Sequence, residues 1–296
     1  MRFYHETFIA DAFKNVLNDL LNNPDFITSP RGMEVREIRD CSLEIYKPMI
    51  NLYNNKYRSS PRKYIAAELL WYFSGTNNPA YIENYASLWK GIHNPDGTIN
   101  SAYGNLLFED KNKHGITQYQ WVIESLKKDK DSRQAFMHFN KPKHQWFGNK
   151  DQVCTLQALF HIRNNKLYMT LTMRSNDVIY GFMTDWAFFS TLHYHVFLDM
   201  QKYYPELEMG SYTHISHSMH LYERHYELVK KMVTEPFLTD CLPLLNETIV
   251  NEDGSIKDKY LPTIFTPIRA GLEPDYTGDG KNKLLNWCFD RLKNGV

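Results

Sequence analysis

Cys154 stands where a nucleophile would be useful. It follows the polar run FGNKDQV and opens the strand-like segment CTLQALFHI, so its sulfur lies at a strand edge where it can face a cleft. A free cysteine is more often a small buried apolar residue, and position alone does not choose between the two interpretations. Arg133 and Arg174 lie in segments that could pair with this strand, and a nearby guanidinium lowers a thiol pKa and favours the thiolate. Cys154 is therefore a candidate for covalent catalysis.

A run of polar side chains ends another predicted strand, at MRSNDV, residues 173 to 178. Asn and Asp are ordinary turn residues at such a position. Arg174 is unusual there, because a planar guanidinium beside the hydroxyl of Ser175 suits a phosphate, which it can hold through two parallel hydrogen bonds. Arg31, in the turn SPRG, is a second candidate of the same kind. The segment is thus either a simple turn or part of a phosphate site.

His214, His217 and His220 are spaced by three residues, as the ligands of a metal site on a helix would be. The Ile, Tyr and Ser residues around them favour extended chain instead. Period-two geometry would place His214 and His220 on one face of a strand and His217 on the other, which separates the three potential ligands. We therefore expect no metal site.

The composition argues against several other classes of protein. Lys and Arg total 34, as do Asp and Glu, so no basic field favours a nucleic-acid backbone and any phosphate binding must be local. The N-terminus lacks the basic-then-apolar order of a signal peptide, and no stretch approaches the roughly 18 apolar residues of a membrane span. The cysteines are too scattered for a disulfide framework or a zinc site. We expect a cytoplasmic protein, in the host cytoplasm if it is viral, with no membrane partner and no direct nucleic-acid binding.

The elements that must position these residues follow from patterning. With 43% hydrophobic residues and no repeat or linker, residues 1–296 are expected to form one α+β domain. Helices are predicted over residues 6 to 22, from Ser60 as N-cap to Gly75 as stop, from Asn78-Pro79 towards Trp89, over Trp186 to Met200, and from about Glu223. The second of these helices contains Glu68.

Strand-like alternation is predicted for QAFMHF, CTLQALFHI and KLYMTLTM, the last two joined as a hairpin by the loop RNN. The segment SYTHISHSMHLY is also predicted to be extended. Residues 234–296 contain clusters of Pro and Gly and are expected to form an irregular C-terminal extension, apart from the short terminal helix LLNWCFDRL.

The order of these motifs resembles the thymidylate synthase family, and most closely its phage deoxycytidylate hydroxymethylases. The segment AAELLWYFSGTNNPAYI is similar to the family's HELLWFL-type helix, and SLW and AYG follow it. DSRQ, Cys154, MRSNDVIYGF and MHLYERH then appear in the family's order, over roughly residues 30 to 230. The resemblance implies a mixed β-sheet packed with helices, with one sheet face forming the interface of a homodimer.

The resemblance also implies an activity, the transfer of a one-carbon unit from 5,10-methylenetetrahydrofolate to C5 of a pyrimidine deoxynucleoside monophosphate. C5 is a poor nucleophile until a thiolate adds to C6, and this is the role implied for Cys154. Glu68 and Tyr103 are implied to move protons. The implied nucleotide-binding residues are Arg31, Arg133 (reaching across the homodimer interface), Arg174 and Ser175 at the phosphate, Asp185 at the base, and His220 and Tyr222 at the 3′-hydroxyl. The residues implied to contact folate are Trp89 and Asp177.

Asp185, in GFMTD, departs informatively from the synthases, which have asparagine at this position. A carboxylate offers only acceptors and would repel the O4 lone pairs of uracil in a dehydrated pocket. Cytosine presents N4–H₂ there, and a protonated N3 adds a second donor. Asp185 therefore favours cytosine, and the phage hydroxymethylases that this chain resembles also have aspartate.

Other departures bear on the final step. Gln134 replaces a second arginine, Thr155 replaces a histidine, Ile92 replaces a second tryptophan, and the chain ends in KNGV without the synthases' apolar tail. A synthase excludes water so that tetrahydrofolate can reduce the one-carbon group, whereas a hydroxymethylase must admit water. The looser pattern favours water.

The leading hypothesis is therefore hydroxymethylation of dCMP at C5, giving a nucleotide that a virus would use to mark its DNA. A dUMP hydroxymethylase or a thymidylate synthase, a methyltransferase, remains possible, because the residues around Asp185 could protonate or move it. A third possibility, from a different class, is a non-catalytic nucleotide- or RNA-binding relative that keeps the fold. Retention of Cys154, Glu68 and Tyr103 together argues against it.

Overall fold

The computed structural model describes residues 1–276 and 282–295. Its strands are β1 (Arg2–Glu6), β2 (Phe26–Thr28), β3 (Val35–Ile45), β4 (Leu52–Asn54), β5 (Phe136–His138), β6 (Thr155–Arg163), β7 (Lys166–Met173), β8 (Asn176–Asp177), β9 (Glu208–Tyr222) and β10 (Leu238–Asp240). Its α-helices are α1 (Ile9–Asn22), α2 (Arg62–Phe73), α3 (Tyr103–Phe108), α4 (Gln118–Lys128), α5 (Phe182–Gln201), α6 (Tyr226–Val233), α7 (Thr266–Arg269) and α8 (Lys283–Asn294).

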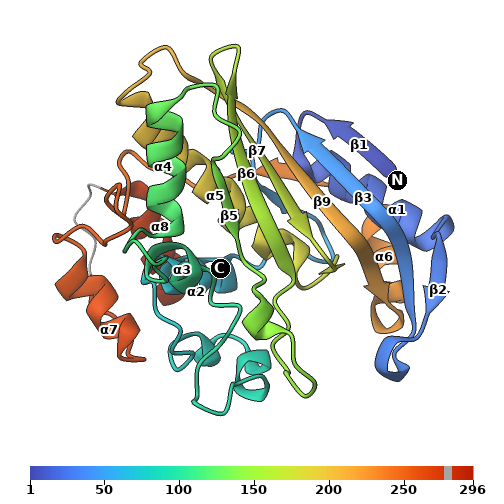
Figure 1. Cartoon of the computed structure of the whole chain (residues 1–296). Helices are drawn as coiled ribbons and strands as arrows, with labels where there is room; N and C mark the ends of the chain where they lie inside the picture. Colours follow the sequence, from blue (N-terminus) through green and yellow to red (C-terminus); the bar gives the residue numbers. More distant parts are fainter. Residues whose placement is uncertain (277–281, 296) are drawn as a thin grey trace.

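One mixed sheet organises the molecule (Figure 1). Its strand order is β1-β3-β9-β7-β6-β5, with β2 paired to β3 and β8 paired to β9. The β1·β3 and β7·β9 pairs are parallel, whereas β3·β9, β6·β7 and β5·β6 are antiparallel. Helices α1, α4 and α5 pack against the sheet, and α2 packs against α5. The expected α+β class and mixed sheet are confirmed.

The predicted hairpin is present between β6 and β7. Arg163 pairs with Lys166, and the two loop residues Asn164 and Asn165 have φ of 49° and 57°, a left-handed conformation that asparagine tolerates in tight hairpin turns. Along both strands buried side chains alternate with partly exposed ones. The sheet therefore has one face covered by helices and one more open face.

The segment SYTHISHSMHLY is extended, as predicted, but the buried face of β9 changes along its length. The fully buried side chains are first Tyr212, His214 and Ser216, and then Met219 and Leu221. The shift occurs beside Asp40 of β3, which has φ of 51° and whose Oδ1 lies 2.7 Å from Nδ1 of the exposed His217. The prediction that His214 and His220 share a face is therefore wrong.

The helix that carries Glu68 begins one residue later than predicted. Pro61, not Ser60, is the N-cap of α2. The hydroxyl of Ser60 instead accepts a hydrogen bond from the backbone N–H of Tyr53 at 2.9 Å, so it binds the preceding strand rather than the helix end. The helix ends before Gly75, whose φ of 72° suits the predicted stop.

The continuous helix predicted from Asn78-Pro79 towards Trp89 is wrong. The chain forms two short 3₁₀ helices, η2 (Ile82–Asn84) and η3 (Ser87–Gly91), separated by Ala86 in extended conformation. The side chain of Asn78 accepts from the N–H of Ala80 at 3.0 Å, which makes a local turn instead of a cap for a long helix.

Residues 234–296 contain more regular structure than expected. Strand β10 pairs with β4, and a π-helical turn η6 (Leu261–Phe265) leads into α7. The predicted terminal helix is α8, which packs against α2. The part of this predicted irregular region at residues 277–281 and 296 lies outside the described residues.

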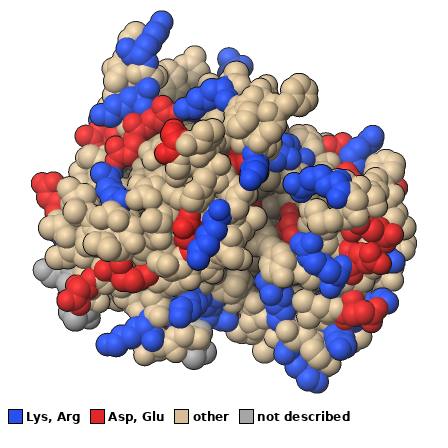
Figure 2. All heavy atoms as spheres, turned by 90° about the horizontal axis from the view of Figure 1, so that it is seen from below, with Lys and Arg blue, Asp and Glu red and all other residues tan. Residues whose placement is uncertain are grey.

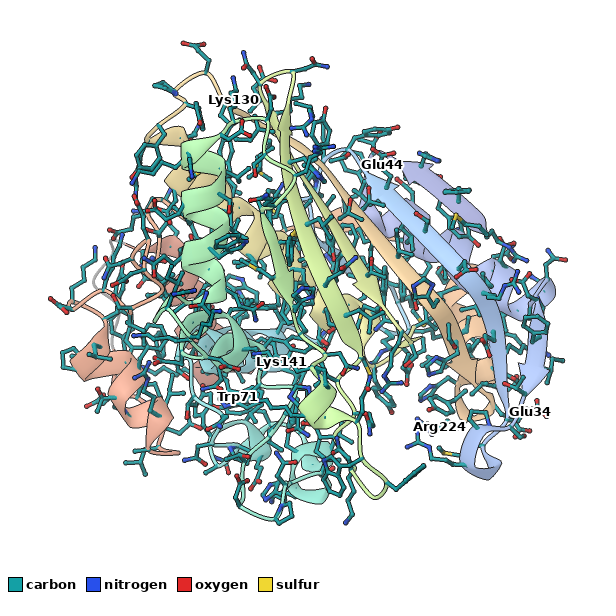
Figure 3. The ribbon with its side chains drawn as sticks, in the orientation of Figure 1. Glu34, Glu44, Trp71, Lys130, Lys141 and Arg224 are labelled. Atoms are coloured by element: carbon teal, nitrogen blue, oxygen red, sulfur yellow. The ribbon has the colours of Figure 1, made fainter. Side chains whose placement is uncertain are left out.

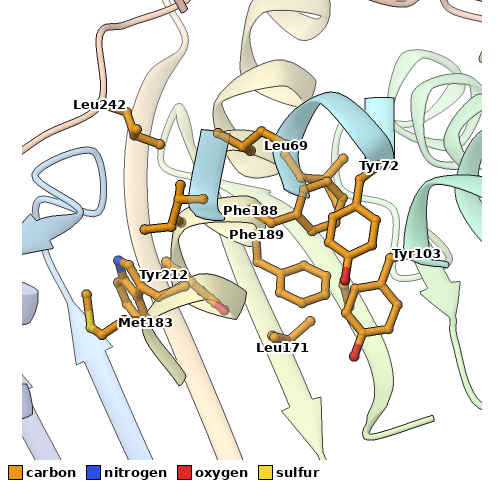
Figure 4. Close-up of a cluster of buried hydrophobic side chains, with 14 of the residues drawn as sticks. Leu69, Tyr72, Tyr103, Leu171, Met183, Phe188, Phe189, Tyr212 and Leu242 are labelled. Carbon is orange, nitrogen blue, oxygen red and sulfur yellow. The ribbon is translucent and has the colours of Figure 1, made fainter. Parts of the chain in front are cut away.

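An aromatic cluster joins the helices that carry the candidate site (Figure 4). Tyr72 of α2 and Tyr103 of α3 stack with ring centroids 5.2 Å apart, and both rings contact Phe188 of α5. Tyr103 also packs on Phe189, at 5.5 Å. Burial of each such ring stabilises the fold by roughly 1.5–3 kcal/mol. The cluster thus fixes α2, α3 and α5 relative to one another.

Candidate active site

Cys154 lies at the entrance to β6 and is held beside the residues that follow β7. The Arg174 Nη2 lies 3.5 Å from its sulfur, and the Ser175 hydroxyl lies 3.9 Å from it. The same guanidinium binds the backbone carbonyls of Val153 at 3.1 Å and Gln152 at 2.6 Å. Arg174 therefore both shapes the turn that presents the thiol and places positive charge next to it.

The charge around the thiol is mixed. Burial raises the pKa of Cys154 above its usual value, although Arg174 and the hydrogen bond from Ser175 lower it, and Asp185 and Asp151 raise it further. The expectation that arginine would favour the thiolate holds for Arg174, but burial outweighs it in the free protein. Loss of the thiol proton is therefore a step that the site must assist.

Asp151 ties the cysteine segment to the chain before α3. Its carboxylate accepts from the Ser101 hydroxyl at 2.6 Å and from the Ser101 backbone N–H at 2.8 Å. The side chain of Asn100 donates to the carbonyl of Asp151 at 3.1 Å. Because Ser101 lies two residues before Tyr103, this link fixes Tyr103 relative to Cys154.

Tyr103 is buried, and its hydroxyl is hydrogen-bonded to that of Thr155 at 2.9 Å. Gly104 explains how the tyrosine comes so close to α2. A Cβ at this position would lie 1.6 Å from the carbonyl oxygen of Tyr72, so only glycine permits this approach. The AYG motif is thus a packing contact as well as a source of the hydroxyl.

Glu68 is buried inside α2 and is the acceptor of a short hydrogen-bonded chain. The Tyr64 hydroxyl donates to its Oε1 at 2.8 Å, and the Tyr72 hydroxyl lies 3.4 Å away. Trp89 Nε1 donates to the Tyr64 hydroxyl at 3.0 Å. Burial raises the pKa of Glu68 to about 8, and the nearby carboxyl of Asp185 adds to the shift. Glu68 can therefore hold or release a proton near neutral pH.

Asp185, in the first turn of α5, is a second carboxyl of the site and is partly buried. Burial raises its pKa to about 7, against a hydrogen bond that the Asn176 amide donates to Oδ2 at 2.8 Å. Its negative charge acts on Glu68, Tyr103 and Cys154. The four predicted catalytic residues, which lie in α2, in α3, just before β6 and in α5, therefore influence one another electrostatically.

The two candidate residues for the 3′-hydroxyl and one of the two folate candidates, Asp177, lie on the neighbouring strands β8 and β9. Asp177 of β8 pairs with His220 of β9, and the rings of His220 and Tyr222 contact each other at 5.2 Å. Asp177 Oδ1 accepts from the backbone N–H groups of Ile179 and Tyr180, which orients the carboxylate at the turn into α5.

Two of the predicted phosphate residues are not beside Cys154. Arg31 is exposed in the 3₁₀ turn η1 (Pro30–Gly32), near the end of β9 that carries Tyr222. Arg133 is exposed just before β5, which pairs so that it lies near the hairpin end of β6, opposite Cys154. Lys130, which binds Asn165 of that hairpin, marks this end in Figure 3. The interpretation that Arg133 flanks the thiol in the same subunit is therefore wrong, because antiparallel pairing carries it away.

The opposite end of the molecule, where β6 begins, is seen from below in Figure 2. It is hollowed near its centre, and Lys and Arg side chains stand around the hollow. Such a concave surface with local positive charge suits a small anionic ligand.

Several residues of the site have roles that the sequence did not reveal. Thr155, Asp151 and Tyr64 hold the predicted residues in place, and Asn176 binds Asp185. Asn176 was visible as the polar residue inside RSNDV, but its partner, nine residues further along, could only be found from the fold.

Among the described residues, every helix is too short or too polar to span a membrane. Residues 1–276 and 282–295 contain no group of three or more His, Cys, Asp or Glu placed to hold a metal.

A partly buried thiol beside an arginine, with two carboxyls of raised pKa and a buried tyrosine, defines a site for covalent and proton-transfer chemistry. The family model for thymidylate synthase matches residues 11–258. The chain therefore belongs to the thymidylate synthase family and is a one-carbon transferase that uses methylenetetrahydrofolate.

Three relatives illustrate the range of the family. Deoxycytidylate 5-hydroxymethyltransferase of Enterobacteria phage T4 is 29% identical over 216 residues, which are 71% of this chain and 84% of the phage protein. Deoxyuridylate hydroxymethyltransferase of Bacillus phage SP01 is 28% identical over 306 aligned residues, 94% of this chain and 78% of that protein. Thymidylate synthase of Buchnera aphidicola is 30% identical over 177 residues, 57% of this chain and 63% of the synthase.

Proposed function

We propose that this chain converts dCMP, methylenetetrahydrofolate and water to 5-hydroxymethyl-dCMP and tetrahydrofolate. Cys154 adds through its sulfur to C6 of the base, and the electron pair that leaves the C5–C6 double bond makes C5 nucleophilic. Arg174, 3.5 Å from the sulfur, stabilises the thiolate that forms.

The observation that carries this proposal is Asp185. Its Oδ2 already accepts from Asn176, and Oδ1 makes no hydrogen bond within the described part of the chain. As a partly buried acceptor, Asp185 suits the N4–H and the protonated N3 of cytosine and opposes the O4 of uracil. The charge is worth most on the intermediate in which N3 carries a proton, so the interaction favours catalysis as well as binding.

Glu68 and Tyr103 are the proposed proton-transfer residues. Glu68, with a pKa of about 8, can give a proton to the base and recover it within one turnover. Tyr103 is proposed to act at C5, where a proton must leave. Its hydroxyl is oriented for this by Thr155.

Nucleotide binding is proposed to involve Arg174 and Ser175 at the phosphate, with Arg31, and His220 and Tyr222 at the 3′-hydroxyl. We further propose that the more open face of the sheet is a homodimer interface. A second copy packed on this face would bring its own Arg133 to the phosphate, which explains why this residue lies away from Cys154 within one subunit.

Methylenetetrahydrofolate supplies the one-carbon unit when bound. The residues present fit such a molecule, because its pterin presents N–H donors and Asp177 offers a partly exposed carboxylate that the turn into α5 orients. Trp89, joined to Glu68 through Tyr64, is proposed to stand beside it. Thr155 and Ile92, at positions where synthases have histidine and tryptophan, favour water as the final nucleophile.

A dUMP hydroxymethylase is the second candidate. With a pKa of about 7, Asp185 carries a proton part of the time at neutral pH, and a protonated carboxyl can donate to O4 of uracil. The relative in phage SP01, which aligns with 94% of this chain, is named for this reaction.

The test is an incubation of the purified protein with methylenetetrahydrofolate and either dCMP or dUMP. Mass spectrometry of the nucleotide distinguishes a hydroxymethyl from a methyl product, and release of tritium from C5 measures turnover. We expect hydroxymethyl-dCMP and little reaction of dUMP. Tritium release from dUMP alone would overturn the proposal.

A further inference from the structure

Asp185 is the end of a chain of hydrogen bonds that runs back into the core. The Asn176 amide Nδ2 donates to Asp185 Oδ2 at 2.8 Å, and its Oδ1 lies 3.2 Å from Nε2 of His214. On the other side of the imidazole, Nδ1 lies 3.0 Å from the hydroxyl of Tyr212. We call Asn176, His214 and Tyr212 the relay. It connects β8 and β9 to the first turn of α5.

Packing leaves the relay little freedom. His214 and Tyr212 are fully buried, and Asn176 is 4% exposed. Trp186 of α5 stacks on the Tyr212 ring with centroids 4.2 Å apart, and Phe182 meets the His214 ring edge-on at 5.1 Å. Because both aromatic residues lie within one turn of Asp185, the packing that holds the relay also fixes the carboxyl.

The donors and acceptors of the relay have one consistent direction. The amide oxygen of Asn176 can only accept, so the Nε2 that faces it must carry a proton. Burial lowers the pKa of His214 to about 3, so at neutral pH the ring has a single proton and Nδ1 is an acceptor for the Tyr212 hydroxyl. Each member of the relay thus donates its hydrogen bond in the direction of Asp185, and the last donor, the amide of Asn176, donates to Oδ2.

If the hydrogen bonds of the relay ran in the reverse direction, the carboxyl of Asp185 would have to be protonated. If the amide of Asn176 turned over, its oxygen would face Oδ2, and that pair is tolerable only when the carboxyl is protonated. His214 would then have to carry its proton on Nδ1. The two directions therefore correspond to an acceptor carboxylate, which suits cytosine, and a donor carboxyl, which suits uracil.

We infer that the relay of Asn176, His214 and Tyr212 sets base specificity by holding Asp185 as an acceptor. These are positioning residues, since they act through Asp185 and not on the base. The inference rests on the proposed function in so far as cytosine is the preferred base. It adds that the preference depends on side chains outside the base pocket.

The experiment measures dissociation constants and kcat/KM for dCMP and for dUMP with the full-length protein. Asn176→Ala removes the donor to Asp185, and we expect dCMP to lose about tenfold or more, as for a hydrogen bond to a charged group, while dUMP changes by less than about threefold. His214→Gln is expected to act in the same direction. Tyr212→Phe keeps the ring on Trp186 and is expected to reduce the preference by about two- to fivefold. His217→Gln, on the exposed part of the same strand, is the matched control and should leave the ratio unchanged.

The ratio of dCMP to dUMP is the decisive readout, because a purely structural defect would weaken both nucleotides equally. Equal losses for the two nucleotides in Asn176→Ala and Tyr212→Phe would overturn the inference. A wild-type protein that prefers dUMP would overturn the proposed function instead. In that case the relay is still supported if the variants move the ratio further towards dUMP, and it is rejected if they do not.

Discussion

The hydroxyls of Thr155 and Tyr103 are hydrogen-bonded at 2.9 Å, although the two residues lie 52 positions apart in the chain. The residue that follows the proposed nucleophile Cys154 therefore orients the residue proposed to act at C5. Cys154 and Tyr103 are connected a second time through Asp151 and Ser101. These two links make the position of the thiol and of the tyrosine hydroxyl depend on each other.

Thr155→Val keeps the shape of the side chain and removes this hydrogen bond. We expect turnover of dCMP to fall by about tenfold, because the buried Tyr103 hydroxyl loses its partner and its orientation. Tritium release from C5 of dCMP measures the step concerned. Thr155→Ser restores the hydroxyl and should recover most of the rate, and equal losses in both variants would refute this role.

Cys154→Ala should abolish product formation, by at least about 10⁴-fold, while nucleotide binding persists, because the thiolate is the only group proposed to activate C5. Cys241→Ala, which changes an exposed cysteine, is the control. Normal nucleotide turnover by the Cys154 variant would contradict covalent catalysis. Absence of turnover in the wild type as well would favour a non-catalytic binding protein.

Arg174 is expected to control the reactivity of the thiol in the free protein. Because burial raises the Cys154 pKa and Arg174 opposes it, Arg174→Gln should slow alkylation by iodoacetamide at pH 8 by about five- to tenfold. The wild-type rate should continue to rise above pH 9. Arg174→Lys retains a positive charge and should give an intermediate rate. If all three proteins react alike, the guanidinium does not stabilise the thiolate.

Glu68→Gln should make the protein more stable at pH 8 and far less active. The pKa of Glu68 is about 8 in the folded protein and about 4.3 in an unfolded chain, so ionisation favours unfolding. This cost is absent below about pH 4, grows as the pH rises and is complete above about pH 8. We expect the variant to gain roughly 2–6 °C in Tm at pH 8 and almost nothing at pH 4. Glu124→Gln, at an exposed position of α4, should show no such dependence.

Asp185→Asn should shift the base preference towards dUMP. The amide of Asn176 can still donate to the new side-chain oxygen, which leaves an NH₂ group for O4 of uracil. We expect the ratio of kcat/KM for dCMP to that for dUMP to fall by about 100-fold or more. The variant is assayed with both nucleotides in parallel, and an unchanged ratio would exclude Asp185 as the base-reading residue.

Local patterns were sufficient for much of the fold. The Asn-Asn hairpin, the apolar helix α5 and the extended β9 could be predicted because the local sequence of each favours the conformation that it adopts. The failures occurred where a side chain found a partner elsewhere. Ser60 binds the backbone of Tyr53 instead of capping α2. The irregular backbone of β3 at Asp40 changes which face of β9 is buried, and the sequence of β9 itself does not indicate this change.

The candidate site divides in the same way. Cys154 and Asp185 could be recognised because their side chains carry the proposed chemistry and occur within recognisable motifs. Arg133 was misplaced, since the direction in which β5 pairs with β6 decides which end it occupies. Thr155 acts through Tyr103, 52 positions away, and Asn176 acts through Asp185, nine positions away. These pairs come into contact only in the folded protein, so the sequence did not indicate them.

Gly104 limits how this enzyme can change over evolutionary time. A side chain there would collide with the carbonyl of Tyr72, and the collision would be relieved only by moving α3 away from α2. Such a movement would separate Tyr103 from Glu68 without altering either residue. A mutation at Gly104, which carries no reactive group, would therefore disturb the geometry between the two residues proposed to transfer protons, so this position is far less free to change than its lack of a side chain suggests.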